Sequence, residues 1–198
     1  MTKFATVTLL ILSLAFMVAT PVLAGETKAD KEKQAKADKE RQEIRKTAKD
    51  ILARLYKAQP SAKAAIEKAA GHAVFSNFGM KIFVAGSGTG KGVAVDNKTK
   101  KETFMKMVEL QAGLGFGVKK FSLIWVFETP QTLATFVNSG WELGGQTSVA
   151  AKAGDTGAAV QGAIPVSPGV WVYQLTDTGV ALELTAKGTK YYKDDDLN

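Results

Sequence analysis

The chain has 198 residues, of which 45% are hydrophobic, with no cysteine, one histidine and a formal net charge of +7. Without cysteine it cannot form a disulfide, a thiolate nucleophile, a cysteine-ligated zinc site or an iron–sulfur cluster. A single histidine also excludes a metal site built from several imidazoles. A chain of this length can bury a hydrophobic core as one domain without covalent cross-links.

Residues 1–24 have the features of a secretory signal peptide. Lys3 supplies a short positive region, residues 4–19 are almost entirely apolar, and a compact Val-Leu-Ala sequence then occupies the positions that a signal peptidase reads. We therefore expect cleavage between Ala24 and Gly25 and a mature protein that is periplasmic or secreted. The alternative is an uncleaved membrane anchor, which the shortness of the apolar run disfavours.

Glycine divides the remaining chain into two compositions. Residues 26–70 contain no glycine, whereas 18 of the 19 glycines lie from Gly71 onward. Glycine destabilises a helix interior by about 1 kcal/mol but fits turns, bulges and closely packed strands. The sequence therefore predicts a helical N-terminal part followed by a sheet.

The helical part has two segments of different character. Residues 26–43 carry alanine as their only apolar side chain among interleaved charges, which is compatible with a solvated helix or a disordered linker. From Ile44, apolar residues recur at steps of three and four, which predicts an amphipathic helix ending before Pro60 and a second short helix over residues 61–70. The expected domains are a signal peptide (1–24), a charged linker or solvated helix (25–43) and a folded domain (44–198).

Strand-like segments and turns fill the rest of the chain. Residues 110–118 alternate apolar side chains with glycine, glutamine and lysine, and residues 121–127 form an apolar run typical of a strand buried on both faces. Thr129-Pro130 predicts a short helix that ends at Gly140. Further strands are expected at 82–85, 93–95, 103–108, 141–143, 147–151, 170–175 and 180–185. The predicted fold class is α+β, with N-terminal helices followed by a curved, mostly antiparallel, barrel-like β-sheet with one short inserted helix.

Three features of the sequence have residue types that can support chemistry: a glycine-rich run, the single histidine and a run of aspartates. The glycine-rich run 86–92 contains Gly-Lys but lacks the earlier glycine and the following Ser or Thr of a phosphate-binding loop, so we expect a connection between strands and no nucleotide. His72 has no recognisable catalytic partner, and Asp194 to Asp196 lack the spacing of a calcium loop and are expected to form a solvated tail. We predict no enzyme activity, no metal site and no cofactor.

Charge concentrates in the N-terminal helices. Residues 26–57 hold 11 basic and 7 acidic side chains. A basic amphipathic helix can lie on anionic lipid, and it can equally pack its apolar stripe on the sheet while the lysines are solvated. Nucleic acid is not expected as a partner because no basic, aromatic-interleaved motif is present.

Four segments, taken in order, resemble the SYLF domain. They are Ala69 to Phe75, the glycine-rich stretch through Gly92-Val93, the strand Leu110 to Val118, and residues 188–198. This domain is the lipid-binding domain of yeast actin-patch proteins and their animal relatives, and it also occurs in secreted bacterial proteins. The resemblance covers roughly residues 45–198 and implies binding rather than catalysis.

The resemblance also implies a mode of binding, in which a basic amphipathic helix associates with acidic phospholipid, while some eukaryotic members contact actin. Carried onto this chain, the helix is the segment from Ile44 to Lys57, whose apolar residues would enter the lipid interface. The expected lipid-binding residues are Arg45, Lys46, Lys49, Ile51, Arg54, Leu55 and Lys57. The expected partner is anionic phospholipid or a membrane surface. The alternative is an envelope structural or protein-interaction module in which the helix packs internally.

Overall fold

The computed structural model describes residues 27–82, 85–112, 117–143, 161–181 and 188–198. The described helices are α1 (Lys28–Ala58), α2 (Ser61–Lys68) and α3 (Pro130–Ser139). The strands are β1 (Gly71–Ile82), β2 (Ala85–Asp96), β3 (Glu102–Ala112), β4 (Gly117–Phe127), β5 (Trp141–Leu143), β6 (Ile164–Ser167), β7 (Val170–Thr176), β8 (Gly179–Ala181) and β9 (Thr189–Lys193). The expected signal segment, the strand expected at 147–151 and most of that at 180–185 lie outside the described residues.

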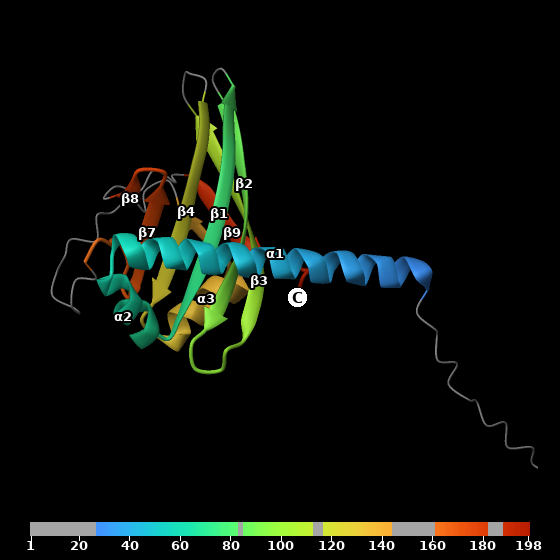
Figure 1. Ribbon diagram of the computed structural model, residues 1–198, viewed down its shortest axis with the longest axis horizontal. Helices are drawn as coiled ribbons and strands as arrows, with labels where there is room; N and C mark the ends of the chain where they lie inside the picture. Colours follow the sequence, from blue (N-terminus) through green and yellow to red (C-terminus); the bar gives the residue numbers. More distant parts are fainter. Residues whose placement is uncertain (1–26, 83–84, 113–116, 144–160, 182–187) are drawn as a thin grey trace, which may run out of the picture.

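The strands form one curled antiparallel sheet in the order β5-β9-β3-β2-β1-β4-β7-β6, with β8 paired to β7 (Figure 1). Strands β1, β2 and β3 are joined in sequence, whereas β4 returns to pair with β1 on its other side. A long helix precedes the sheet and a short helix is inserted in it. The expected fold class is therefore confirmed.

The sheet has a core on each face because its side chains alternate along every strand. In β1, Ala73 and Phe75 pack on one face, whereas Val74 between them packs on the other. Helix α3 covers the first of these faces through Leu133 and Phe136, and we call it the α3 face. Helices α1 and α2 cover the opposite face, the α1 face (Figure 1).

Aromatic side chains fill the core on the α3 face. Trp125 of β4 lies with its ring centroid 5.0 Å from that of Phe136 and 4.9 Å from that of Tyr191. Phe75 contacts Tyr191 edge-on with the centroids 4.9 Å apart, and Phe127 lies 4.8 Å from Phe136. Such pairs contribute about 0.5–1.5 kcal/mol each beyond the area they bury. These rings join the centre of the sheet to α3 and to the C-terminal strand β9.

The glycine-rich run 86–92 belongs to strand β2, so the expectation of a connection there is wrong, as is that of a separate strand at 82–85. The glycines make room for neighbouring side chains. A Cβ at Gly90 would lie 2.9 Å from the Met107 methyl group, and one at Gly92 would overlap the ring of Phe75. The run therefore has a packing explanation as part of a strand.

Helix α1 is continuous over 31 residues. It begins with a capping box in which the Thr27 hydroxyl accepts from the Asp30 backbone and the Asp30 carboxylate accepts from the Thr27 backbone. For residues 26–43 the sequence is compatible with a solvated helix or a disordered linker, and the structure has the helix from Lys28 onward. Residues 28–36 are exposed on all sides, because this part extends beyond the sheet (Figure 1). The division of the chain at residue 44 stays a prediction.

His72 ties the start of β1 to the turn after β2. Its Nδ1 lies 2.9 Å from Oδ1 of Asn97, whose Nδ2 donates to the carbonyls of Ile66 and Ala69 at the end of α2. Because Nδ2 is the donor to these two carbonyls, the atom facing His72 is Oδ1, which accepts a hydrogen bond from the imidazole Nδ1–H. Burial lowers the pKa of His72 below its usual value of 6.5, against the opposing effect of the Asn97 hydrogen bond. The histidine therefore has a structural role.

This arrangement predicts a loss of stability in mild acid. The unfolded chain takes up a proton on His72 near pH 6.5, whereas the folded protein resists protonation, so stability falls as the pH drops below that value. Replacing His72→Gln keeps a donor for Asn97 and removes the titration. Thermal unfolding at pH 7.5 and pH 5.5 should show a larger drop in Tm for the wild type than for the variant. Equal drops would contradict the role given to His72.

Candidate functional site

The site region is built around α1, which lies across the α1 face of the sheet. Ile44, Ala48, Ile51 and Leu55, spaced three or four apart, are at most 7% exposed. They pack against outward-facing apolar side chains of the central strands, among them Val74, Val93, Phe104, Ile124 and Val126. The period of the sequence thus fixes which side of the helix meets the sheet.

The structure corrects the expected placement of the apolar lipid-binding residues. Ile51 and Leu55 were expected to enter a lipid interface, but they are buried between α1 and the sheet. The physical reason lies in the sheet, whose α1 face carries its own apolar side chains and needs a cover. Each fully buried aliphatic side chain contributes about 1.5–3 kcal/mol, so this contact is a substantial part of the fold. In this conformation neither residue is accessible to lipid.

The basic candidates divide into two groups. Lys46, Lys49 and Lys57 are exposed, lie opposite the buried stripe, and form no ion pair within the described ranges. Arg54 is also exposed, but its Nη2 donates to the carbonyl of Thr176, 3.2 Å away. Arg45 is partly buried. The structure thus brings four of the five together on the solvent side and turns Arg45 inward.

Arg45 is fixed by two contacts with β3. Its Nε donates to Oε2 of Glu102 at 2.7 Å, and its guanidinium lies 5.1 Å above the centre of the Phe104 ring. A charge-assisted hydrogen bond to the carboxylate and a cation–π contact with the aromatic ring hold the side chain in one orientation. Arg45 therefore helps to dock α1 on the sheet.

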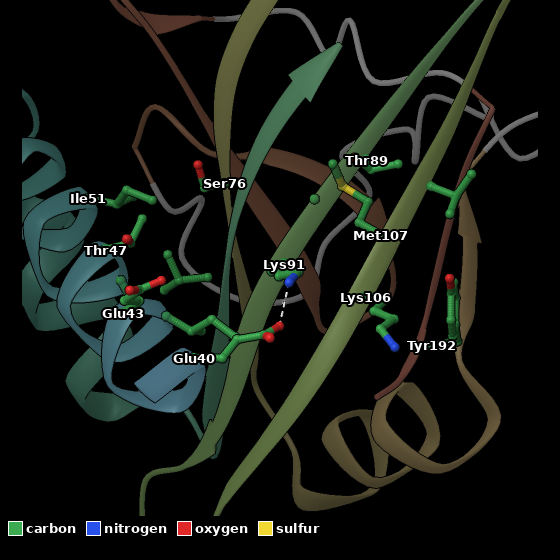
Figure 2. Close-up of a pocket in the computed structure, with 15 residues that line it drawn as sticks. Glu40, Glu43, Thr47, Ile51, Ser76, Thr89, Lys91, Lys106, Met107 and Tyr192 are labelled. Atoms are coloured by element: carbon green, nitrogen blue, oxygen red, sulfur yellow. Dashed lines mark hydrogen bonds and ion pairs between the residues drawn. The ribbon is translucent and has the colours of Figure 1, made fainter. Parts of the chain in front are cut away.

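A groove of about 530 Å³ runs along one flank of α1, between the helix and strands β1, β2, β3 and β9 (Figure 2). Lys91 and Lys106 lie directly opposite one another on neighbouring strands there. Like charges in this position repel, and each lysine has its own acidic partner. Lys91 pairs with Glu40 of α1, and Lys106 pairs with Asp194 at 2.7 Å. The hydrogen bond that Lys106 donates to the Asp194 carboxylate raises the pKa of Lys106.

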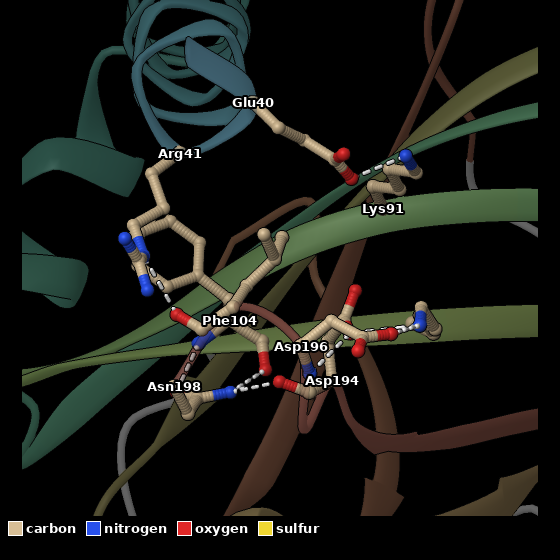
Figure 3. A network of polar contacts seen from close by, with 9 residues as sticks. Glu40, Arg41, Lys91, Phe104, Asp194, Asp196 and Asn198 are labelled. Carbon is tan, nitrogen blue, oxygen red and sulfur yellow. Dashed lines mark hydrogen bonds and ion pairs between the residues drawn. The ribbon is translucent and has the colours of Figure 1, made fainter. Parts of the chain in front are cut away.

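The C-terminal segment after β9 is docked on β3 (Figure 3). The Asn198 side chain accepts from the Phe104 backbone N–H at 3.0 Å and donates to the Phe104 carbonyl at 2.8 Å. Arg41 of α1 donates from Nε to the carbonyl of Leu197 at 2.8 Å. Asp194, which is 2% exposed, pairs with Lys106. The expected solvated tail is therefore wrong for Asp194, whose partner Lys106 the fold brings from β3, whereas Asp195 and Asp196 are exposed.

The described residues also bear on metal sites and on membrane-spanning helices. No group of three or more histidine, aspartate or glutamate side chains is placed to hold a metal ion among these residues. In the same part of the chain, no helix combines the length and the hydrophobicity needed to cross a bilayer.

Comparison with known proteins gives one family match and one similar curated protein. Residues 108–198 match a family model described as Ysc84, Las17-binding protein actin regulator. Beta cell expansion factor A of Aeromonas veronii is 34% identical over 156 residues, which cover 78% of this chain and 57% of that protein. The chain thus spans little more than half the length of this relative.

The structure is a domain in which helices cover a curled antiparallel sheet. The match over residues 108–198 confirms the resemblance to the SYLF (Ysc84) family that the sequence predicts.

The docked C-terminal segment generates a prediction about stability. Changing Asp194→Asn removes the negative partner of Lys106 in a buried position, and we expect a loss of about 1–3 kcal/mol in the free energy of unfolding. Urea unfolding followed by tryptophan fluorescence measures this change. The neighbouring exposed Asp195→Asn is the matched control, and it should stay within about 0.5 kcal/mol of the wild type. Similar losses in both variants would contradict the role of the pair.

Proposed function

We propose that the protein is an exported, non-enzymatic lipid-binding protein that associates with anionic phospholipid at a membrane surface through the solvent side of α1. The observation that carries this proposal is the separation of the two sides of the helix. Lys46, Lys49 and Lys57 are exposed and unpaired in the described structure, while the opposite stripe is held by the sheet. The resemblance to the SYLF family supports lipid as the class of ligand.

The energetics favour attachment by charge with α1 still docked. A basic residue near an anionic surface contributes about 1 kcal/mol, so three such lysines supply about 3 kcal/mol. Insertion of Ile51 and Leu55 would require α1 to leave the sheet, and Val74, Val93 and Phe104 would then lose their cover. Exposing several such side chains costs more than the lysines contribute. The proposed bound state is therefore peripheral.

The alternative function is a protein-interaction or envelope structural module. Two features favour it: α1 packs internally along its apolar stripe, and residues 28–36 extend beyond the sheet with exposed side chains. The matching family model also carries the description of a Las17-binding actin regulator. A protein partner would then contact the projecting part of α1.

Vesicle binding tests the proposed mechanism. We expect residues 25–198 to co-sediment with vesicles containing 30% phosphatidylglycerol in phosphatidylcholine at low salt, and to dissociate at high salt. Changing Lys46, Lys49 and Lys57 to Gln should weaken binding roughly a hundredfold, because about 3 kcal/mol is lost.

The matched control removes the same charge elsewhere on α1. Lys31, Lys33 and Lys36 lie among acidic residues in the projecting part, and changing them to Gln should alter the affinity less than threefold. Equal losses in the two triple variants would show that only net charge matters. Absence of wild-type binding at either salt concentration would refute the lipid mechanism and favour the protein-interaction alternative.

Export is tested separately. When the full chain is expressed in a Gram-negative bacterium, intact mass of the periplasmic protein should correspond to an N-terminus at Gly25. Changing Ala24→Tyr should leave the precursor unprocessed, since the peptidase requires a small residue there, whereas Ala24→Gly should be processed normally. A full-length mass for the wild type would contradict the proposed cleavage.

A further inference from the structure

A second hollow, on the other flank of α1, has a different charge from the groove. It has a volume of about 690 Å³ and lies between α1, the start of β3, the end of α3 and the C-terminal segment. We call it the α1–β3 pocket. Its charged lining consists of four cations and two carboxylates: Arg41, Arg45, Lys101, Lys193, Asp38 and Glu102. The pocket therefore carries an excess of positive charge.

The two arginines of the pocket are held in place. Arg41 donates from Nη1 to Asp38 at 2.6 Å and from Nε to the Leu197 carbonyl at 2.8 Å. Arg45 is fixed by Glu102 and by the Phe104 ring. Guanidinium groups that are already oriented lose little conformational entropy when an anion binds. The two guanidinium groups are thus preorganised hydrogen-bond donors on one side of the pocket.

The two lysines of the pocket supply the excess charge. Lys101 lies at the end of the turn before β3, and Lys193 is the last residue of β9. Both are exposed, and neither forms an ion pair with any residue that the structure describes. The two carboxylates are matched by the arginines, so the lysine charges remain available to a ligand.

We propose that the α1–β3 pocket binds a phosphate ester, with Lys101 and Lys193 as the charge donors and the oriented arginines as hydrogen-bond donors. The groove on the opposite flank does not fit such a ligand. Its lysines are already paired, and Glu40 and Glu43 line it as well. This inference rests on the proposed lipid-binding function and adds to it a pocket for the phosphate of the headgroup.

The position of the pocket connects it to the solvent side of α1. Lys49 follows Arg45 by four residues, so the two side chains are neighbours on the helix surface. The positive rim of the pocket therefore continues into the exposed face formed by Lys46, Lys49 and Lys57. A phospholipid can reach both at once, whereas a soluble phosphate ester reaches the pocket alone.

The test compares a pocket variant with a matched control. The pocket variant changes Lys101 and Lys193 to Gln, and the control changes Lys98 and Lys190, each three residues earlier in the chain and outside the pocket lining. Both remove two positive charges from exposed positions. Binding is measured with the 30% phosphatidylglycerol vesicles and, by amide chemical shifts, with soluble glycerol 3-phosphate. We expect the pocket variant to lose at least tenfold in affinity for both probes, and the control less than threefold.

The outcomes separate this proposal from the one on which it rests. In one outcome, vesicle binding falls equally in both variants, and ester binding is either absent or equally affected. That result would overturn the proposed phosphate site and leave the role of α1 intact. Ester binding that depends on the pocket, with no vesicle binding by the wild type, would support the pocket for a soluble ester and refute the lipid mechanism. Absence of wild-type binding to both probes would overturn both proposals.

Discussion

The packing of the apolar stripe of α1 on the sheet is the contact on which the other features of the α1 side depend. The lysines opposite this stripe face solvent, because the side chains of Ile44, Ile51 and Leu55 pack on the sheet. The same contact places Glu40 beside Lys91 and Arg45 beside Glu102, one on each flank of the helix. A single hydrophobic stripe thus sets the orientation of the charged groups on the part of α1 that lies over the sheet.

Charge compensation then joins distant parts of the chain. Lys91 and Lys106 are neighbours across β2 and β3, and their mutual repulsion is relieved from two directions. Helix α1 brings Glu40 and the C-terminal segment brings Asp194. The polar contacts in Figure 3 therefore connect the first helix and the last residues of the chain to β2 and β3.

Local pattern and long-range contact differ in what the sequence can reveal. The spacing of Ile44, Ile51 and Leu55 predicts the buried side of a helix, and it leaves open whether that side meets lipid or protein, because both are apolar. The glycines of β2 wrongly predict a connection between strands. Gly90 and Gly92 instead leave room for side chains of the neighbouring strands, those of Met107 and Phe75. Asp194 likewise carries no local sign of burial, because its partner lies 88 positions earlier, at Lys106. The convergence of Arg41, Arg45, Lys101 and Lys193 on one pocket also depends on tertiary structure alone.

Helix α1 also separates two surfaces that differ in charge. Glu40, Glu43 and Thr47 project toward the groove, whereas Arg41 and Arg45 line the α1–β3 pocket. The exposed lysines lie between these two flanks and adjoin the pocket through Lys49. A negatively charged surface approaching α1 therefore experiences attraction from its solvent side and from the pocket. It experiences repulsion from Glu43, which is exposed and forms no ion pair with any described residue. This asymmetry favours a tilted orientation, with the pocket side of the helix closer to such a surface than the groove side.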